Sequence, residues 1–155
     1  MYRTGGKMEL LKRIIFVGKS GATREPMAVG ILKECIANKD VEILARGLVV
    51  SFPEPMNQKA EAVLISNGIV MDKFVSVELK NEDITEDTLV LTMETKHKKK
   101  VLSRFENATE DNVFVLTEFV GDELEILDPY GGALTAYGLC YETLRKSIKK
   151  LVKIL

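Results

Sequence analysis

The chain has 155 residues, of which 46% are hydrophobic and 29% are charged, a balance typical of one soluble globular domain. Lys and Arg total 22 and Asp and Glu total 23, so the net charge is close to neutral. This balance argues against nucleic acid or an anionic membrane surface as the main partner. No apolar stretch approaches the length of a membrane span.

The first residues of the chain and its two cysteines bound the domain organisation and the cellular location. The first residues are polar, with no apolar run of the signal-peptide type, so we expect residues 1–10 to form a flexible extension and residues 11–155 a single domain. Cys35 and Cys140 lie in apolar, helix-like contexts that predict two core residues and no disulfide. Because no disulfide framework is expected, a reducing, cytoplasmic location is the default. No metal-ligand spacing surrounds either cysteine, and we expect neither metal nor cofactor.

Short apolar runs alternate along the chain with helical patterns. Residues 14–17 are a continuous apolar run, as expected for a strand that is buried on both faces. A helix follows, with Pro26 in its first turn and apolar residues at helical spacing up to Cys35. The remaining strands are predicted at 41–48, 88–92 and 113–116, and the remaining helices at 58–66, 95–105 and 136–155.

This alternation predicts an α/β fold. We expect a three-layer sandwich in which a four-stranded parallel sheet carries helices on both faces, with a phosphate loop after the first strand. Ligands of such sheets bind beyond the carboxyl ends of the strands. The last helix is expected to bury one apolar face, formed by Leu139, Leu144, Ile148, Leu151 and Val152.

The segment after the first predicted strand can bind an anion. Because it opens a helix, its backbone N–H groups converge on one point and the helix dipole favours negative charge there. The guanidinium of Arg24 can grip two phosphate oxygens. The alternative is a tight turn with a surface arginine. The candidate phosphate-binding residues are Gly18, Lys19, Ser20, Gly21, Ala22, Thr23 and Arg24.

Three motifs resemble the low-molecular-weight protein tyrosine phosphatase family. The family sequence Cys-x5-Arg-Ser-Pro-Met-Ala is matched by Gly18-x5-Arg24-Glu25-Pro26-Met27-Ala28. Its Asp-Pro-aromatic-Gly-Gly is matched by Asp128-Pro129-Tyr130-Gly131-Gly132. Leu91-Thr92-Met93, with His97-Lys98 behind it, is similar to the bacterial, Gram-positive branch that includes protein-arginine phosphatases.

The resemblance implies a role for each matching residue. Gly18 stands where the family has its nucleophilic cysteine, so the nucleophile position is vacant. Arg24 matches the arginine that stabilises the transition state, and Asp128 matches the general acid. Tyr130 would form a wall of the pocket. Since Cys35 and Cys140 lie in other segments, covalent catalysis by the family route is not available.

Other positions depart from the family as well. Glu25 replaces a hydroxyl residue, Gly21 a bracing asparagine, Ala45 a serine and Phe74 a histidine. These changes remove the polar network that supports a reactive thiolate, so we predict that Gly18→Cys alone gains little activity.

The side chain of Glu25 has two possible positions. We expect it to point into solvent at the start of its helix, where the helix dipole stabilises a carboxylate. The alternative is that it folds back onto Arg24 and fills the loop. A like charge ~4 Å from a bound phosphate costs about 1 to 4 kcal/mol, so Glu25 weakens phosphate binding.

These observations favour a pseudophosphatase, which binds a phosphorylated protein or a free phosphate or sulfate anion through Gly18–Arg24. One alternative is a weakly active phosphoprotein phosphatase that uses water activated by Asp128, and another is a scaffold with a vestigial loop. We favour a turn-forming role for Asp128. For the basic run 96–100 we favour a solvated helix face over a docking patch. Tyr137 and Tyr141 fit either core or surface positions.

Overall fold

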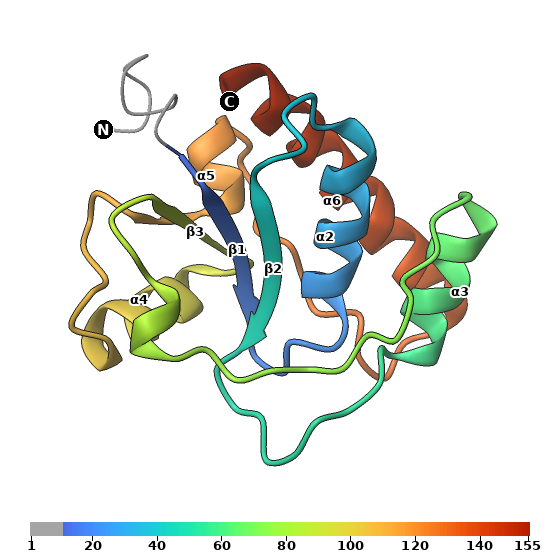
Figure 1. Cartoon of the computed structure of the whole chain (residues 1–155). Helices are drawn as coiled ribbons and strands as arrows, with labels where there is room; N and C mark the ends of the chain where they lie inside the picture. Colours follow the sequence, from blue (N-terminus) through green and yellow to red (C-terminus); the bar gives the residue numbers. More distant parts are fainter. Residues whose placement is uncertain (1–10) are drawn as a thin grey trace.

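The computed structural model describes residues 11–155, and the predicted extension lies outside the described residues (Figure 1). The described residues form a four-stranded sheet with the strand order β2-β1-β3-β4, in which every pairing is parallel. The strands are β1 (Arg13–Gly18), β2 (Glu42–Gly47), β3 (Thr88–Thr92) and β4 (Val113–Val115). The predicted α/β fold is therefore confirmed.

Side chains of the central strand β1 alternate between two hydrophobic clusters, one on each face of the sheet. Ile14 and Phe16 belong to the larger cluster, which α2 (Arg24–Cys35), α3 (Gln58–Ser66), α5 (Leu116–Val120) and α6 (Leu134–Ile154) cover. Ile15 and Val17 belong to the smaller cluster, beneath α4 (Thr95–Arg104) and the short helix η1 (Asn81–Asp83). The two faces explain why the sequence of β1 is apolar without interruption.

Two predictions of core residues were wrong. Leu139 is 69% exposed, because the buried face of α6 is formed by Tyr137, Cys140, Tyr141 and Leu144, which repeat every three or four residues. Cys35 is also exposed, because the last turn of α2 extends beyond the core, and Ile36 is the next residue to be buried. The helix α5 was not predicted, since Leu116 was assigned to the preceding strand.

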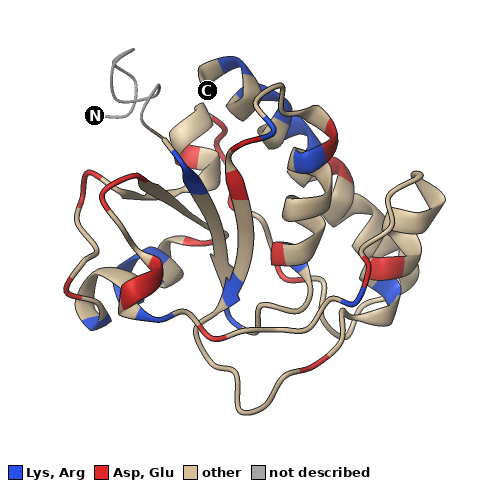
Figure 2. Cartoon of the chain, in the orientation of Figure 1, with Lys and Arg blue, Asp and Glu red and all other residues tan. Residues whose placement is uncertain are grey.

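The surface carries charges of both signs. Figure 2 shows acidic and basic residues interspersed over the helices and loops. On α4, Lys96, Lys99 and Lys100 are exposed, as expected for a solvated helix face, while His97 is buried. Among residues 11–155, no helix combines the length and the apolar character that crossing a membrane requires.

Candidate functional site

The Gly18–Arg24 loop leaves the carboxyl end of β1 and packs closely against the end of β2. Gly21 has a φ of +74°, and a Cβ atom there would lie 2.8 Å from the backbone nitrogen of Gly47. Only glycine meets both conditions without strain. The N–H of Leu48 donates to the carbonyl of Gly18 at 3.0 Å, which ties the loop to the next strand. The loop therefore has backbone support of its own, although the asparagine of the family is missing.

The carboxylate of Glu25 lies inside the loop. Glu25 is only 1% exposed. Its Oε2 atom is 1.7 Å from the point that a Cβ atom on Gly18 would occupy, about one covalent bond length away. Its Oε1 atom accepts a hydrogen bond from the N–H of Thr23 at 3.3 Å. The expectation that Glu25 points into solvent was wrong, because the absent side chain of Gly18 leaves room for the carboxylate.

Burial raises the pKa of Glu25 above its ordinary value of 4.5. The positive charge of Arg24 and hydrogen bonds from the backbone N–H groups of Glu25 and Thr23 act in the opposite direction, and the charge of Asp128 adds to the rise. The net direction is upward. The effect of desolvation on the pKa of Glu25 thus exceeds the opposite effect of Arg24 and the backbone hydrogen bonds.

The guanidinium of Arg24 has partners other than Glu25. Arg24 is 2% exposed, and its Nη1 atom donates to Oε2 of Glu94 at 2.6 Å and to the carbonyl of Ile126 at 2.5 Å. Its Nη2 atom lies 3.9 Å from Oδ2 of Asp128. The alternative in which Glu25 fills the loop is correct for the position of its carboxylate, but the ion-pair partners of Arg24 are Glu94 and Asp128.

Glu94 is held in place by His97. The backbone N–H of Glu94 donates to Nδ1 of His97 at 3.1 Å, and Nε2 of this buried histidine has no hydrogen-bond partner. Burial, with the charge of Arg24 as a second cause, lowers the pKa of His97 to about 4, so the imidazole is neutral at physiological pH. Burial alone would raise the pKa of Glu94, but the hydrogen bond and the charge of Arg24 lower it.

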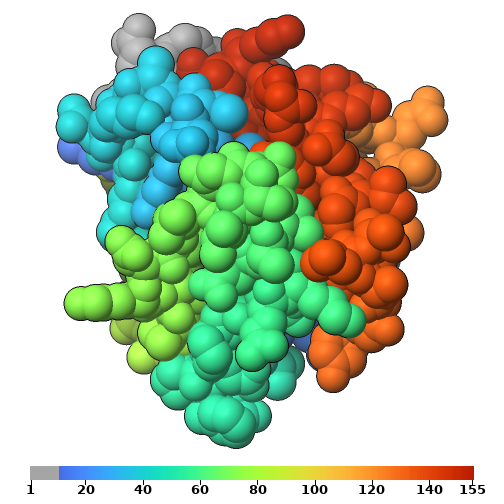
Figure 3. Space-filling model, turned by 90° about the vertical axis from the view of Figure 1, so that its right-hand side faces the viewer, coloured from blue at the N-terminus to red at the C-terminus, as the bar shows by residue number. Residues whose placement is uncertain are grey.

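Asp128 and Tyr130 lie across a pocket from the loop. Oδ1 of Asp128 accepts a hydrogen bond from the N–H of Tyr130 at 3.0 Å, an arrangement that forms a local turn. The pocket has a volume of about 340 Å³. Its lining comprises Lys19, Ser20, Ala22, Thr23, Arg24, Glu25, Glu54, Pro55, Asn57, Asp128 and Tyr130. Figure 3 shows the segment before α3 and the segment before α6 side by side at this end of the molecule.

Neither cysteine can supply a nucleophile to this pocket. Cys140 is buried, and burial raises the pKa of its thiol to about 12, so it stays protonated at neutral pH. Cys35 is exposed at the far end of α2 from the loop. Within the described part of the chain, no group of three or more His, Cys, Asp or Glu residues could hold a metal ion.

Glu94 and Ile126 were not predicted as partners of Arg24. Glu94 follows β3, the neighbour of β1, and the carboxyl ends of parallel strands meet at one edge of a sheet. Its position was therefore predictable. The carbonyl of Ile126 and the pocket residues Glu54 and Asn57 belong to irregular segments, for which the sequence carries no comparable signal.

Comparison with known proteins places this geometry in a family. The family model described as low molecular weight phosphotyrosine protein phosphatase matches residues 13–155. The chain belongs to this family. It is 30% identical over 143 residues to the low molecular weight protein-tyrosine-phosphatase PtpB of Staphylococcus aureus, covering 92% of this chain and 99% of that protein.

Two solved structures of the family have the same fold. The YwlE arginine phosphatase from Geobacillus stearothermophilus matches with a TM-score of 0.83 and 32% identity, over 92% of this chain and 91% of that one. The low molecular weight protein tyrosine phosphatase from T. tengcongensis matches with a TM-score of 0.85 and 32% identity, over 93% and 99%. The resemblance stated from the motifs is confirmed.

Proposed function

We propose that this chain is a cytoplasmic pseudophosphatase, a family member that does not hydrolyse phosphomonoesters. One observation carries the proposal. Gly18, at the position that the resemblance assigns to the nucleophile, has no side chain, and the carboxylate of Glu25 occupies the adjoining space. The first step of the family reaction, attack by a thiolate, has no group to perform it.

The other candidates for a nucleophile in the pocket are weak. The carboxyl group of Glu25 is 1% exposed and accepts the N–H of Thr23, which leaves it little access to a phosphorus atom in the pocket. Asp128 could activate a water molecule, but its Oδ1 accepts the N–H of Tyr130 and its Oδ2 lies 3.9 Å from Arg24. These contacts favour a turn-forming role for Asp128.

The ligand that we propose is the phosphate group of a phosphorylated protein, or a free phosphate or sulfate anion, at Gly18–Arg24. The backbone N–H groups before α2 and the exposed Lys19 support this proposal. Arg24 lines the same pocket, but its Nη1 atom already donates to Glu94 and to the carbonyl of Ile126. Binding is therefore expected to be weaker than in a family member with a free arginine.

The proposal is tested by turnover. The purified protein is assayed on p-nitrophenyl phosphate and on peptides that carry phosphotyrosine or phosphoarginine, beside Arg24→Ala, Asp128→Asn and Glu25→Gln. An active family phosphatase serves as the positive control. We expect no turnover by the wild-type protein. Wild-type turnover that disappears in Asp128→Asn or in Glu25→Gln would overturn the proposal and would identify the water route or a carboxylate nucleophile, respectively.

A gain-of-function pair tests the reason for inactivity. A side chain at position 18 would collide with the carboxylate of Glu25, so Gly18→Cys alone is expected to gain little activity. Gly18→Cys combined with Glu25→Ser removes the collision and is expected to be the more active of the two variants. Equal activity of the two would show that Glu25 does not limit the chemistry at this position.

A further inference from the structure

The Gly18–Arg24 loop already contains an anion in this structure. The carboxylate of Glu25 is buried where the loop encloses space, and it accepts the backbone N–H of Thr23. Convergent N–H groups at the start of a helix are the groups that hold phosphate in proteins. Here at least one of them is bound to a side chain of the same chain.

The guanidinium of Arg24 is engaged as well. It donates to the carboxylate of Glu94 and to the carbonyl of Ile126, and it lies near Asp128. His97 fixes the backbone of Glu94, so this ion pair is part of a packed arrangement. Arg24 and at least one of the loop N–H groups, the two components that would bind phosphate, therefore have internal partners.

A phosphate group that entered the pocket would meet an unfavourable environment. Three carboxyl groups line the pocket, those of Glu25, Glu54 and Asp128, against the two cations Lys19 and Arg24. Arg24 is already paired with Glu94, which lies outside this lining. The charges therefore oppose a second anion while Glu25 remains in the loop.

We propose that Glu25 is the resident anion of the loop and the residue that decides whether phosphate can enter it. The loop is closed to phosphate while the carboxylate is inside, and it becomes a phosphate site when the carboxylate leaves. This inference rests on the proposed function, because it concerns the same loop. It adds that phosphate recognition by this chain requires a displacement within the protein.

The test is a titration with inorganic sulfate, which keeps both of its charges over the whole neutral and mildly acidic range. Backbone N–H signals of residues 18–24 are followed by NMR in the wild-type protein and in Glu25→Ser. In the wild-type protein at neutral pH we expect only weak binding, because the carboxylate of Glu25 must first leave the loop. In Glu25→Ser we expect saturable binding that is tighter by at least about tenfold, equivalent to about 1.4 kcal/mol. Glu25→Ala is the second variant, should the first fail to fold.

Controls separate occupancy of the loop from general charge. Glu54→Gln removes a carboxylate from the same pocket without touching the loop, and its gain is expected to be much smaller than that of Glu25→Ser. Adding Arg24→Ala to Glu25→Ser should abolish the gained binding. Wild-type binding as tight as that of Glu25→Ser, or equal gains in Glu25→Ser and Glu54→Gln, would overturn the inference.

The titration is independent of the assay for turnover. Turnover by the wild-type protein would overturn the proposed function whatever the sulfate result. Tight sulfate binding by a wild-type protein that lacks turnover would overturn only the inference about Glu25.

Discussion

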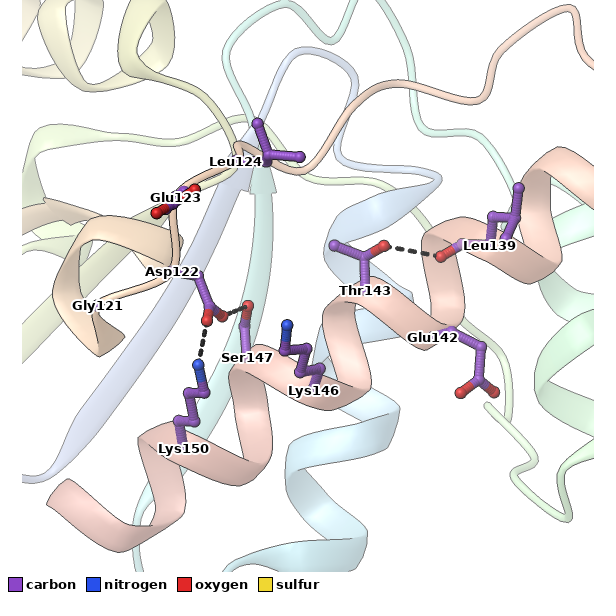
Figure 4. A pocket seen from close by; sticks show the side chains of 10 residues that line it. All are labelled: Gly121, Asp122, Glu123, Leu124, Leu139, Glu142, Thr143, Lys146, Ser147 and Lys150. Atoms are coloured by element: carbon purple, nitrogen blue, oxygen red, sulfur yellow. Dashed lines mark hydrogen bonds and ion pairs between the residues drawn. The ribbon is translucent and has the colours of Figure 1, made fainter.

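Two carboxylates of this protein lie beside cations, yet their environments are opposite. Asp122 follows α5 and accepts hydrogen bonds from the hydroxyl of Ser147, at 2.5 Å, and from the ammonium of Lys150 (Figure 4). Burial alone would raise the pKa of Asp122, but these two hydrogen bonds and the charge of Lys150 lower it below its ordinary value of 3.8. The pKa of Glu25 is raised instead.

The difference lies in how each carboxylate is compensated. Asp122 has a cation of its own, whereas the cation next to Glu25 is hydrogen-bonded to Glu94. A fully paired carboxylate ties α6 to the segment after α5 and needs no functional explanation. A buried carboxylate without full compensation, in a pocket, is the kind of group that marks functional sites.

Removing Arg24, the cation beside Glu25, is expected to change stability most. Arg24→Met leaves Glu94 and Asp128 without their buried partner, and we expect a loss of about 3 to 5 kcal/mol in the free energy of unfolding. Lys150→Met is the matched control, because Lys150 is 42% exposed and its loss should cost about 1 kcal/mol or less. Urea denaturation of both variants measures the difference. Equal losses of unfolding free energy in the two variants would contradict the stronger dependence of the Glu94 and Asp128 carboxylates on Arg24 than of Asp122 on Lys150.

A second prediction concerns Glu25 and pH. Its folded pKa is above 4.5, so the carboxyl contributes its full stability below about that pH and loses it as the pH rises through the folded pKa. The stability of Glu25→Gln does not depend on pH through this position, because glutamine does not titrate. The charged groups Arg24 and Asp128 are present in both proteins. We expect the variant to be more stable than the wild type by about 1 to 2 kcal/mol at neutral pH. The advantage should disappear in acid. A constant difference from acid to neutral pH, in denaturation curves, would contradict the burial of an ionisable group.

Substitution of Asp122 is expected to change stability least. The folded pKa of Asp122 is lowered, so its contribution is present above its ordinary value of 3.8 and is lost as the pH falls through the folded value. Asp122→Asn should therefore be less stable than the wild type by about 1 kcal/mol at neutral pH. The deficit should shrink in acid, opposite in sign to Glu25→Gln. Thermal unfolding over a pH series tests both variants together.

Much of the fold could be predicted because its signals are local. The bounds of α3 and β3 match the predicted ranges, since Asn57 caps the first and an uninterrupted apolar run defines the second. The exposed Leu139 was misassigned because apolar character alone does not state which helix face is buried. Packing of α6 on α2 and α3 makes that choice, and it depends on distant residues.

Residues of the candidate site could be predicted from the sequence, but the position of the Glu25 carboxylate could not. The motifs located the loop, Asp128 and Tyr130. Asp128, Tyr130 and all of the loop residues except Gly18 and Gly21 line one pocket in the structure. The sequence placed Glu25 at the start of the helix, beside the anion site, but the predicted direction of its side chain was wrong. That direction depends on the space left at Gly18 and on the capture of Arg24 by Glu94, a residue from another strand end.

A double-mutant cycle between positions 18 and 25 measures directly whether the carboxylate of Glu25 occupies the loop. Gly18 is not among the glycines with positive φ, so alanine suits its backbone, but the added Cβ atom would lie 1.7 Å from Oε2 of Glu25. We predict that Gly18→Ala destabilises the wild-type protein by about 1 to 3 kcal/mol more than it destabilises Glu25→Ala. Additive effects, within about 0.5 kcal/mol, would show that the carboxylate of Glu25 does not occupy the loop.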